Sequence, residues 1–272
     1  MKRWLCSEVR IPVVVWAWVA AFILIVVFPV NAAGPEIFMS GGSAAALSYQ
    51  CTDATHDGAN NAITLCEDFD GVADCGDDAA NAQTCRNAWT VVLGGVDDIV
   101  DLANTAAPAP LIGTRSARVT ATDTAISYAH VSTASSDNLY LHARVNIDSQ
   151  GAWAADANFL SIVRSTGAGV CVLGVDKTTG RWQVYTNTAI VHASLSPSVD
   201  TTYYIWLEHD RNTADTGCRA YISTTSTKPA VTIQGTSLDY AATGIRLRAL
   251  ETHDIVYDHI RINTSAIGSD PQ

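Results

Sequence analysis

Hydrophobic and polar residues alternate along most of the chain beyond Trp89. The alternation is clearest in NLYLHARVNID, residues 138–148, where Leu139, Leu141, Ala143, Val145 and Ile147 occupy every second position. A period of two predicts a β-strand with one face in a core and the other in water. After residue 33, no segment shows the spacing of an amphipathic helix over three turns.

The same pattern, interrupted by Gly, Pro, Asn and Asp, predicts about a dozen antiparallel strands in one domain, residues 51–268. Many short strands without helices indicate an all-β sandwich or barrel. The segments are Ile63–Phe69, Trp89–Leu93, Ile99–Leu102, Ser116–Thr122, Ile126–Val131, Asn138–Asp148, Phe159–Arg164, Gly169–Val175, Arg181–Thr186, Tyr203–Asp210, Cys218–Ser223, Val231–Ile233, Ile245–Leu250 and Asp254–Asn263.

The N-terminal segment does not show this alternation. Lys2, Arg3 and Arg10 precede an uncharged apolar run, residues 13–30, and then small residues. This order predicts a signal peptide, residues 1–33, and a secreted or extracellular domain, with the periplasm or cell surface as further locations. A retained anchor is the alternative, because the run is nearly long enough to span a bilayer. Residues 34–50 form a predicted linker.

Six cysteines follow the leader, and an even number in an exported chain indicates disulfides. Six cysteines allow fifteen pairings, and sequence spacing favours Cys51 with Cys66 and Cys75 with Cys85. Cys171 and Cys218 lie in two strand-like segments and form the third predicted pair. No C-x-x-C motif occurs, which argues against a zinc or redox site.

The net charge of −11 argues against nucleic acid as a partner, because phosphates need a basic patch. It equally disfavours anionic membranes after the leader is removed. The charge is compatible with sugars and with divalent cations.

The order of the segments resembles the concanavalin A-like lectin/glucanase superfamily, and within it the LamG-like jelly-roll domains. The similarity spans residues 63–263. It is carried by CEDFDG, Trp89, GTRSARVTA, LYLHARVNID, VLGVDKTTGRWQVYTN, TTYYIWLEHDRNTADTGCRAYI and DIVYDHIRIN. The resemblance implies an antiparallel jelly-roll β-sandwich, a fold that sugar-binding modules, adhesion domains, glycoside hydrolases and polysaccharide lyases share.

The resemblance also implies a structural calcium ion that joins the first strand to the last. Its expected ligands are Glu67, Asp68 and Asp70 from CEDFDG, and Asp258 from the closing strand. Clustered carboxylates supply the oxygen ligands that calcium prefers. Solvated loop acids, or acids paired with arginines of neighbouring strands, are the alternative interpretation.

Glycoside hydrolysis and polysaccharide lysis each require a particular set of residues. Glycoside hydrolysis needs two carboxyl groups facing one cleft. Glu208 and Asp210 share a strand face, but the third acid of the superfamily's usual motif is replaced by Thr213. A lyase would use a Tyr or His base beside an Arg, a role open to Tyr140, His142 and Arg144.

Ligand binding without catalysis is the leading hypothesis. Polar and aromatic residues that strand alternation directs away from the core could bind sugar hydroxyls or an acidic polysaccharide; the plainer reading is the polar face of a sheet. The candidates are Tyr140, His142, Arg144, Arg181, Tyr185, Arg246, Arg248 and, in a loop, Trp153. Trp182 is a further candidate for stacking on sugars, whereas Trp89 and Trp206 are expected in the core.

The sequence therefore predicts a secreted, non-catalytic recognition domain that binds a glycan or a cell-surface partner. A polysaccharide-degrading enzyme of the same fold is the first alternative. A structural surface or assembly protein is the second. The oligomeric state stays open.

Overall fold

The computed structural model describes residues 65–69, 83–84, 88–105, 110–111, 115–122, 125–149, 157–186, 189–213, 217–236, 238–250 and 253–269. All of them belong to one compact unit, Ala45–Gln272. The predicted signal peptide or anchor and the predicted linker lie outside the described residues. Within the described residues, no helix is long and apolar enough to cross a membrane.

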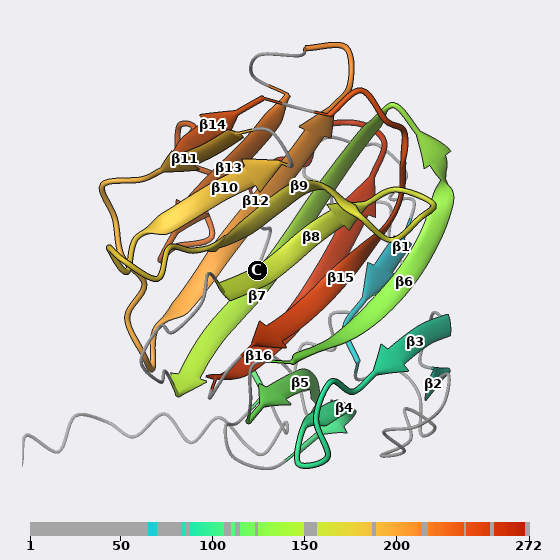
Figure 1. Ribbon diagram of the computed structural model, residues 1–272, viewed down its shortest axis with the longest axis vertical. Helices are drawn as coiled ribbons and strands as arrows, with labels where there is room; N and C mark the ends of the chain where they lie inside the picture. The colour runs from blue at the N-terminus through green and yellow to red at the C-terminus, as the bar shows by residue number, and fades with distance from the viewer. Residues whose placement is uncertain are drawn as a thin grey trace, which may run out of the picture. The chain divides into compact units, whose positions relative to one another are not determined.

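Two antiparallel eight-stranded sheets make up the fold (Figure 1). Sheet A has the order β14-β13-β12-β7-β16-β5-β4, with β1 also paired to β16. Its strands are β1 (Leu65–Glu67), β4 (Ile99–Asn104), β5 (Ser116–Ala121), β7 (Asn138–Ser149), β12 (Thr202–Asp210), β13 (Cys218–Ser223), β14 (Ile233–Gly235) and β16 (His253–Asn263).

Sheet B has the order β11-β10-β9-β8-β15-β6-β3-β2. In Figure 1 its strands β8, β9 and β15 are drawn over β7 and β16 of sheet A. Its members are β2 (Gln83–Thr84), β3 (Ala88–Val92), β6 (Ile126–Ser136), β8 (Ala157–Val163), β9 (Gly169–Val175), β10 (Trp182–Thr186), β11 (Ala189–His192) and β15 (Ala242–Leu250).

The predicted fold class is confirmed: the described chain is an antiparallel β-sandwich. Each predicted strand has a counterpart, with ends shifted by a few residues. The most extended counterpart is β6, which continues from Val131 to Ser136. Two short strands were not predicted, β2 and β11.

The core lies between the sheets and follows the alternation of the sequence. Leu139, Leu141 and Ala143 of β7 are buried in it, as are Phe69 and Trp89, whose ring centroids lie 5.9 Å apart. Burying each large apolar side chain stabilises the fold by roughly 1.5–3 kcal/mol. The expectation that Trp89 is a core residue is confirmed.

The first and last described strands lie side by side. β1 pairs with the C-terminal half of β16, Glu67 opposite Ile260. β5 pairs with the N-terminal half of the same strand. His259 has a positive φ of 49°, and the register shifts there between Asp258 and Arg261. This bulge inserts an extra residue into β16.

A disulfide joins the two sheets. Cys171 of β9 is bonded to Cys218 of β13, with a Cα–Cα distance of 5.2 Å. This confirms the long-range pair predicted from the sequence. Cys66 is also disulfide-bonded. Its predicted partner Cys51 lies outside the described residues, as do Cys75 and Cys85, so the two local pairs stay predictions.

The turn between β9 and β10 forms as its sequence DKTTG suggests. The Asp176 carboxylate accepts hydrogen bonds from the amides of Thr178 and Thr179, at 3.0 and 2.6 Å. Gly180 closes the turn with a φ of 65°, which a side chain would disfavour. The turn fixes the register of β10, the strand that presents Gln183 and Tyr185.

Candidate ligand-binding face

Each sheet has an outer face that points away from the core, and both outer faces include buried side chains. Part of the outer face of sheet A, around Trp206, is covered by the C-terminal segment, residues 264–269. Trp206 of β12 donates from its indole nitrogen to the Gly268 carbonyl at 2.8 Å. Ile267 is only 2% exposed. Trp206 is thus buried as expected, but outside the core between the sheets.

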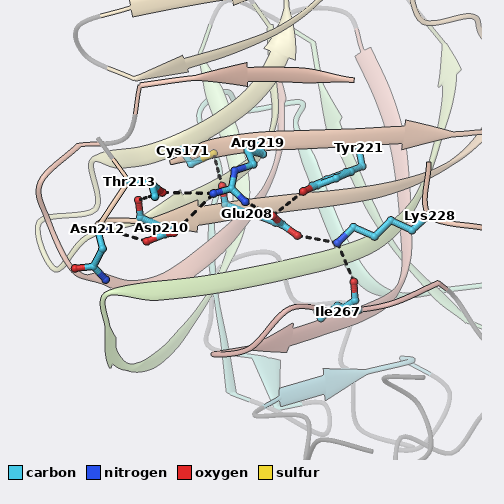
Figure 2. Close-up of polar contacts among 9 residues, drawn as sticks. All are labelled: Cys171, Glu208, Asp210, Asn212, Thr213, Arg219, Tyr221, Lys228 and Ile267. Carbon is cyan, nitrogen blue, oxygen red and sulfur yellow. Dashed lines mark hydrogen bonds and ion pairs between the residues drawn. The ribbon is translucent and has the colours of Figure 1, made fainter. Parts of the chain in front are cut away.

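Glu208 lies on this covered face inside a network of ion pairs (Figure 2). Its carboxylate accepts hydrogen bonds from Lys228 at 2.7 Å and from the Tyr221 hydroxyl at 2.9 Å. Arg219 lies 3.4 Å away and also approaches Asp210 at 3.7 Å. Burial and the Glu208 carboxylate raise the pKa of Tyr221 to about 12, so the hydroxyl stays a donor.

The same network fastens the C-terminal segment. Lys228 donates a second hydrogen bond to the Ile267 carbonyl at 2.9 Å, and its ammonium lies 4.2 Å from the ring centroid of Tyr221. Glu208 is 3% exposed. The role that this geometry supports for Glu208 is structural. Because cationic and hydroxyl groups engage the Glu208 carboxylate, the geometry does not favour Glu208 and Asp210 as a pair of hydrolytic carboxyl groups.

His142 and Arg144 are not on an open surface, which corrects the expected solvent-facing row. His142 is fully buried and Arg144 is 7% exposed. The His142 ring packs on Trp206 with centroids 4.9 Å apart and accepts a hydrogen bond from Arg261 at 3.3 Å. Tyr140, on the same face, is only partly exposed. Alternation identified the outward direction, but the face is covered.

The predicted calcium ligands divide between the two sides of sheet A. Glu67 is paired with the core residue Ile260, and its carboxylate accepts hydrogen bonds from the Trp89 indole at 3.3 Å and the Phe69 amide at 3.2 Å. Asp258 lies opposite Arg144, on the outer side.

Asp68 is buried, and Asp70 lies outside the described residues. Among the residues that the structure describes, no three His, Cys, Asp or Glu side chains gather as a metal site. The described residues therefore do not supply a calcium site by themselves, and calcium binding stays a prediction.

The outer face of sheet B is different. The cross-strand register places Tyr185 of β10, Val172 of β9, Ser161 of β8 and Arg246 of β15 in one row, with His130 of β6 next to Arg246. Arg248 is one step along β15, and its guanidinium donates to the Ser161 hydroxyl at 3.3 Å. We call this surface the arginine face; it comprises His130, Ser161, Gln183, Tyr185, Arg246 and Arg248.

The arginine face carries buried polar atoms without protein partners. Both amide atoms of Gln183 lack a hydrogen bond, and its side chain is fully buried. The Nε atoms of Arg246 and Arg248 and the Nε2 atom of His130 also lack one. Each such group costs roughly 1–3 kcal/mol if left unsatisfied, so these five atoms call for an explanation.

The groups in contact with Arg246 and Arg248 are uncharged and so do not neutralise the two guanidinium groups. Arg246 stacks over the Tyr128 ring at 4.2 Å. The Tyr257 hydroxyl, reaching across the core from β16, lies 2.5 Å from the Arg248 carbonyl oxygen and accepts from the Arg248 amide at 3.3 Å. Arg248 is 9% exposed, and burial lowers its pKa.

A pocket of about 480 Å³ extends the arginine face at one end. It is lined by His130, Arg246, Arg164 and the turn 165–167, together with residues of β6 and β15. Arg164 stacks over the Tyr240 ring at 4.0 Å. Burial lowers the pKa of His130, and the nearby Arg246 charge lowers it further.

The structure thus brings three of the predicted ligand-binding residues together: Tyr185, Arg246 and Arg248. Arg181 precedes β10 and is exposed. Trp153 lies outside the described residues. Trp182 is fully buried in the core, which rules out stacking on a ligand.

Strand alternation placed Gln183 in an outward row with Arg181 and Tyr185, but neither Gln183 nor His130 was among the predicted ligand-binding residues. Each shares a strand face with a selected residue or lies directly across from one, and this register was the signal that could have found them.

Comparison with known proteins adds the fold context. No family model and no curated protein matches the chain. Among solved structures, a sialidase matches with a TM-score of 0.54 and 8% identity, over 75% of this chain and 18% of that one. The protein described as "Cellulose induced protein, Cip1" matches with a TM-score of 0.53 and 12% identity, over 75% and 99% of the two chains.

The catalytic domain of a glycoside hydrolase family 131 protein from Coprinopsis cinerea matches with a TM-score of 0.50 and 14% identity, over 76% and 97% of the two chains. The chain has a concanavalin A-like jelly-roll fold. This confirms the fold that the resemblance implied. At these identities the similarity concerns the fold alone.

Proposed function

We propose that the protein is an extracellular carbohydrate-recognition domain and that the arginine face is its binding surface. The observation that carries the proposal is the set of buried, unpartnered polar atoms on Gln183, Arg246 and Arg248. Sugars present hydroxyl groups that both donate and accept, and these can satisfy an amide and guanidinium groups at once. Tyr128 and Tyr185 add aromatic surface beside them.

The comparisons are consistent with this proposal. The similar structures include a sialidase, a cellulose-induced protein and a glycoside hydrolase, whose names concern carbohydrates. The disulfide between Cys171 and Cys218 suits an oxidising, extracellular setting. Fold alone does not choose between binding and catalysis, so the choice is made on the residues of the site.

Those residues favour binding over hydrolysis. Hydrolysis of a glycosidic bond requires a pair of carboxyl groups beside the ligand. The eight strands of sheet B contain no Asp or Glu. On sheet A, Glu208 is engaged by Lys228, Arg219 and Tyr221. The lyase interpretation based on Tyr140, His142 and Arg144 is likewise disfavoured, because the His142 ring packs on Trp206 and accepts a hydrogen bond from Arg261, and Arg144 stacks over Tyr204.

The test is affinity electrophoresis and calorimetry of the full chain against a panel of neutral and acidic polysaccharides. We expect binding to at least one polymer, and a loss of tenfold or more in affinity for both Gln183→Leu and Arg246→Ala. The matched controls are Gln234→Leu, an exposed glutamine on β14, and Arg211→Ala, on the loop after β12. Binding that survives both test variants would place the site elsewhere, and no binding at all would end the proposal.

A further inference from the structure

The acidic residues of the strands are distributed very unevenly. The strands of sheet A contain seven: Glu67, Asp101, Asp148, Glu208, Asp210, Asp254 and Asp258. The strands of sheet B contain none, although the chain has a net charge of −11. Sheet B therefore presents arginine and histidine without any countercharge from its own strands.

The arginines of this face are not used by the fold as ion-pair partners. In the part of the chain that the structure describes, Arg246 and Arg248 form no ion pair. Their polar neighbours are neutral: the Ser161 hydroxyl and the Tyr128 ring. By contrast, Arg118 and Arg219 of sheet A both pair with carboxylates. Asp176 is close to sheet B, but it lies in the β9–β10 turn and is engaged by that turn and by His192 at 3.8 Å.

Keeping a buried cation without a counterion is costly, and the cost is compensated when an anion binds. Arg248 is in that position, at 9% exposure and with a free Nε. A guanidinium matches a carboxylate through two parallel hydrogen bonds. The Gln183 amide, on β10 and separated from β15 by β9 and β8, offers a donor and an acceptor for hydroxyl groups of another sugar of the same polymer.

We infer that the ligand is an acidic polysaccharide whose uronate carboxylate is bound by Arg248 and Arg246. This rests on the proposed carbohydrate function of the arginine face and specifies its substrate class. The pocket lined by Arg164 and His130 extends the same cationic strip, so a second acidic residue of the polymer would lie there. A chain of uronates would thus be recognised along the sheet, by charge repeated along its length.

The experiment uses pairs of polymers that differ only in charge. The full chain is titrated with polygalacturonate, alginate and glucuronan, and with the same polymers after carboxyl reduction to the neutral sugar. We expect at least one polyuronate to bind, a tenfold or greater loss on reduction, and weaker binding in 1 M than in 0.15 M salt. A sulfated polysaccharide serves as the arm that distinguishes carboxylate from other anions.

The variants test the assignment of the residues. Arg248→Gln should reduce affinity for the polyuronate at least tenfold. Arg246→Gln, at a less buried position, should do the same if Arg248→Gln folds poorly. Arg211→Ala, outside the face, should change affinity less than twofold. Circular dichroism and urea unfolding confirm that each variant is folded.

The outcomes separate the two proposals. Equal binding of a polymer before and after carboxyl reduction would overturn the acidic ligand and leave carbohydrate recognition standing. Binding of the sulfated polymer alone would also overturn the carboxylate assignment. Absence of binding to every polymer, neutral or acidic, would defeat both.

Discussion

Glu208 illustrates, at the scale of a single residue, why a carboxylate on the expected strand face need not be a catalyst. Its side chain is 5% exposed and has cationic partners in Lys228 and Arg219. These partners come from different parts of the chain, and only the folded structure brings them together. Removing one member of a buried ion pair leaves the others with uncompensated charge.

We therefore expect Glu208→Gln to lower the free energy of unfolding by about 3 kcal/mol, because Lys228 and Arg219 lose their counterion. Chemical denaturation in urea measures the change. Asp239→Asn is the matched control, since Asp239 pairs with Arg211 but is 87% exposed, and it should leave stability unchanged. Equal effects of the two substitutions would contradict a structural role for Glu208. Glycan affinity should be the same in both variants.

His209 predicts how stability depends on pH. Burial lowers its pKa below the ordinary 6.5, despite the opposing hydrogen bond to the Tyr240 carbonyl. Between the folded pKa and 6.5 the unfolded chain binds a proton that the folded chain does not. The stability is therefore complete above about pH 6.5 and decreases as the pH falls toward the folded pKa.

Urea midpoints between pH 8 and pH 5 should show this decrease in the wild type. His209→Gln should show a shallower one. Some decrease should persist in the variant, because burial and Arg246 also lower the pKa of His130. A variant with the full pH dependence of the wild type would exclude His209 as the cause.

At the scale of the element, alternation predicted the strands because it reports directly which residues face the core. The pattern in β7 placed Leu139 and Leu141 inside, as observed. It could not reveal that the opposite face is covered. Alternation suggests that His142 is exposed because its neighbours Trp206, His259 and Arg261 are more than sixty residues away in the sequence. The two-residue β2 and the four-residue β11 are too short for a period-two pattern to emerge.

The C-terminal segment, residues 264–269, gives an element-scale prediction. Ile267→Ala should lower the free energy of unfolding by about 2–4 kcal/mol, because this side chain is 2% exposed and its loss leaves a cavity. Ile190→Ala, at a position 56% exposed on β11, is the matched control and should be nearly neutral. Trp206 fluorescence reports whether the segment detaches. A neutral Ile267→Ala would mean that the segment contributes little to the fold.

The disulfide between the two sheets gives a second prediction at the scale of the element. Cys171 and Cys218 are 47 residues apart, and a loop of that length restricts the unfolded chain enough to stabilise the fold by about 4 kcal/mol. The double substitution Cys171→Ala/Cys218→Ala should lose an amount of that order in urea unfolding. Reduction of the wild-type bond should give a similar loss, provided the other disulfides are monitored by mass. Retention of full stability would show that hydrophobic packing alone holds β9 against β13.

At the scale of the whole molecule, the sequence predicted the sandwich and three residues of the candidate face, but not the segregation of charge. Composition gives a net charge of −11 but does not tell how the charged residues are distributed over the two sheets. Only the strand order shows that Arg246, Arg248 and His130 lie in a sheet whose strands have no acid. The net charge follows from composition alone, whereas the grouping of charged residues on one face depends on which sheet each strand joins.

This segregation leads to a prediction about binding kinetics. An acidic glycan that approaches from a distance experiences the repulsive net charge of −11, whereas one at contact experiences the arginine face. The Debye length is about 30 Å at 10 mM salt and about 8 Å at 150 mM. Raising the salt over this range should screen the distant acids of sheet A more than the contacts of Arg246 and Arg248. The association rate constant of a uronate oligosaccharide should therefore increase several-fold, while its dissociation also becomes faster.

Stopped-flow measurements with a fluorescent oligosaccharide resolve the two rates, and the carboxyl-reduced oligosaccharide should show no salt dependence in association. An association rate that falls with salt would mean that the arginine face already dominates the field at long range.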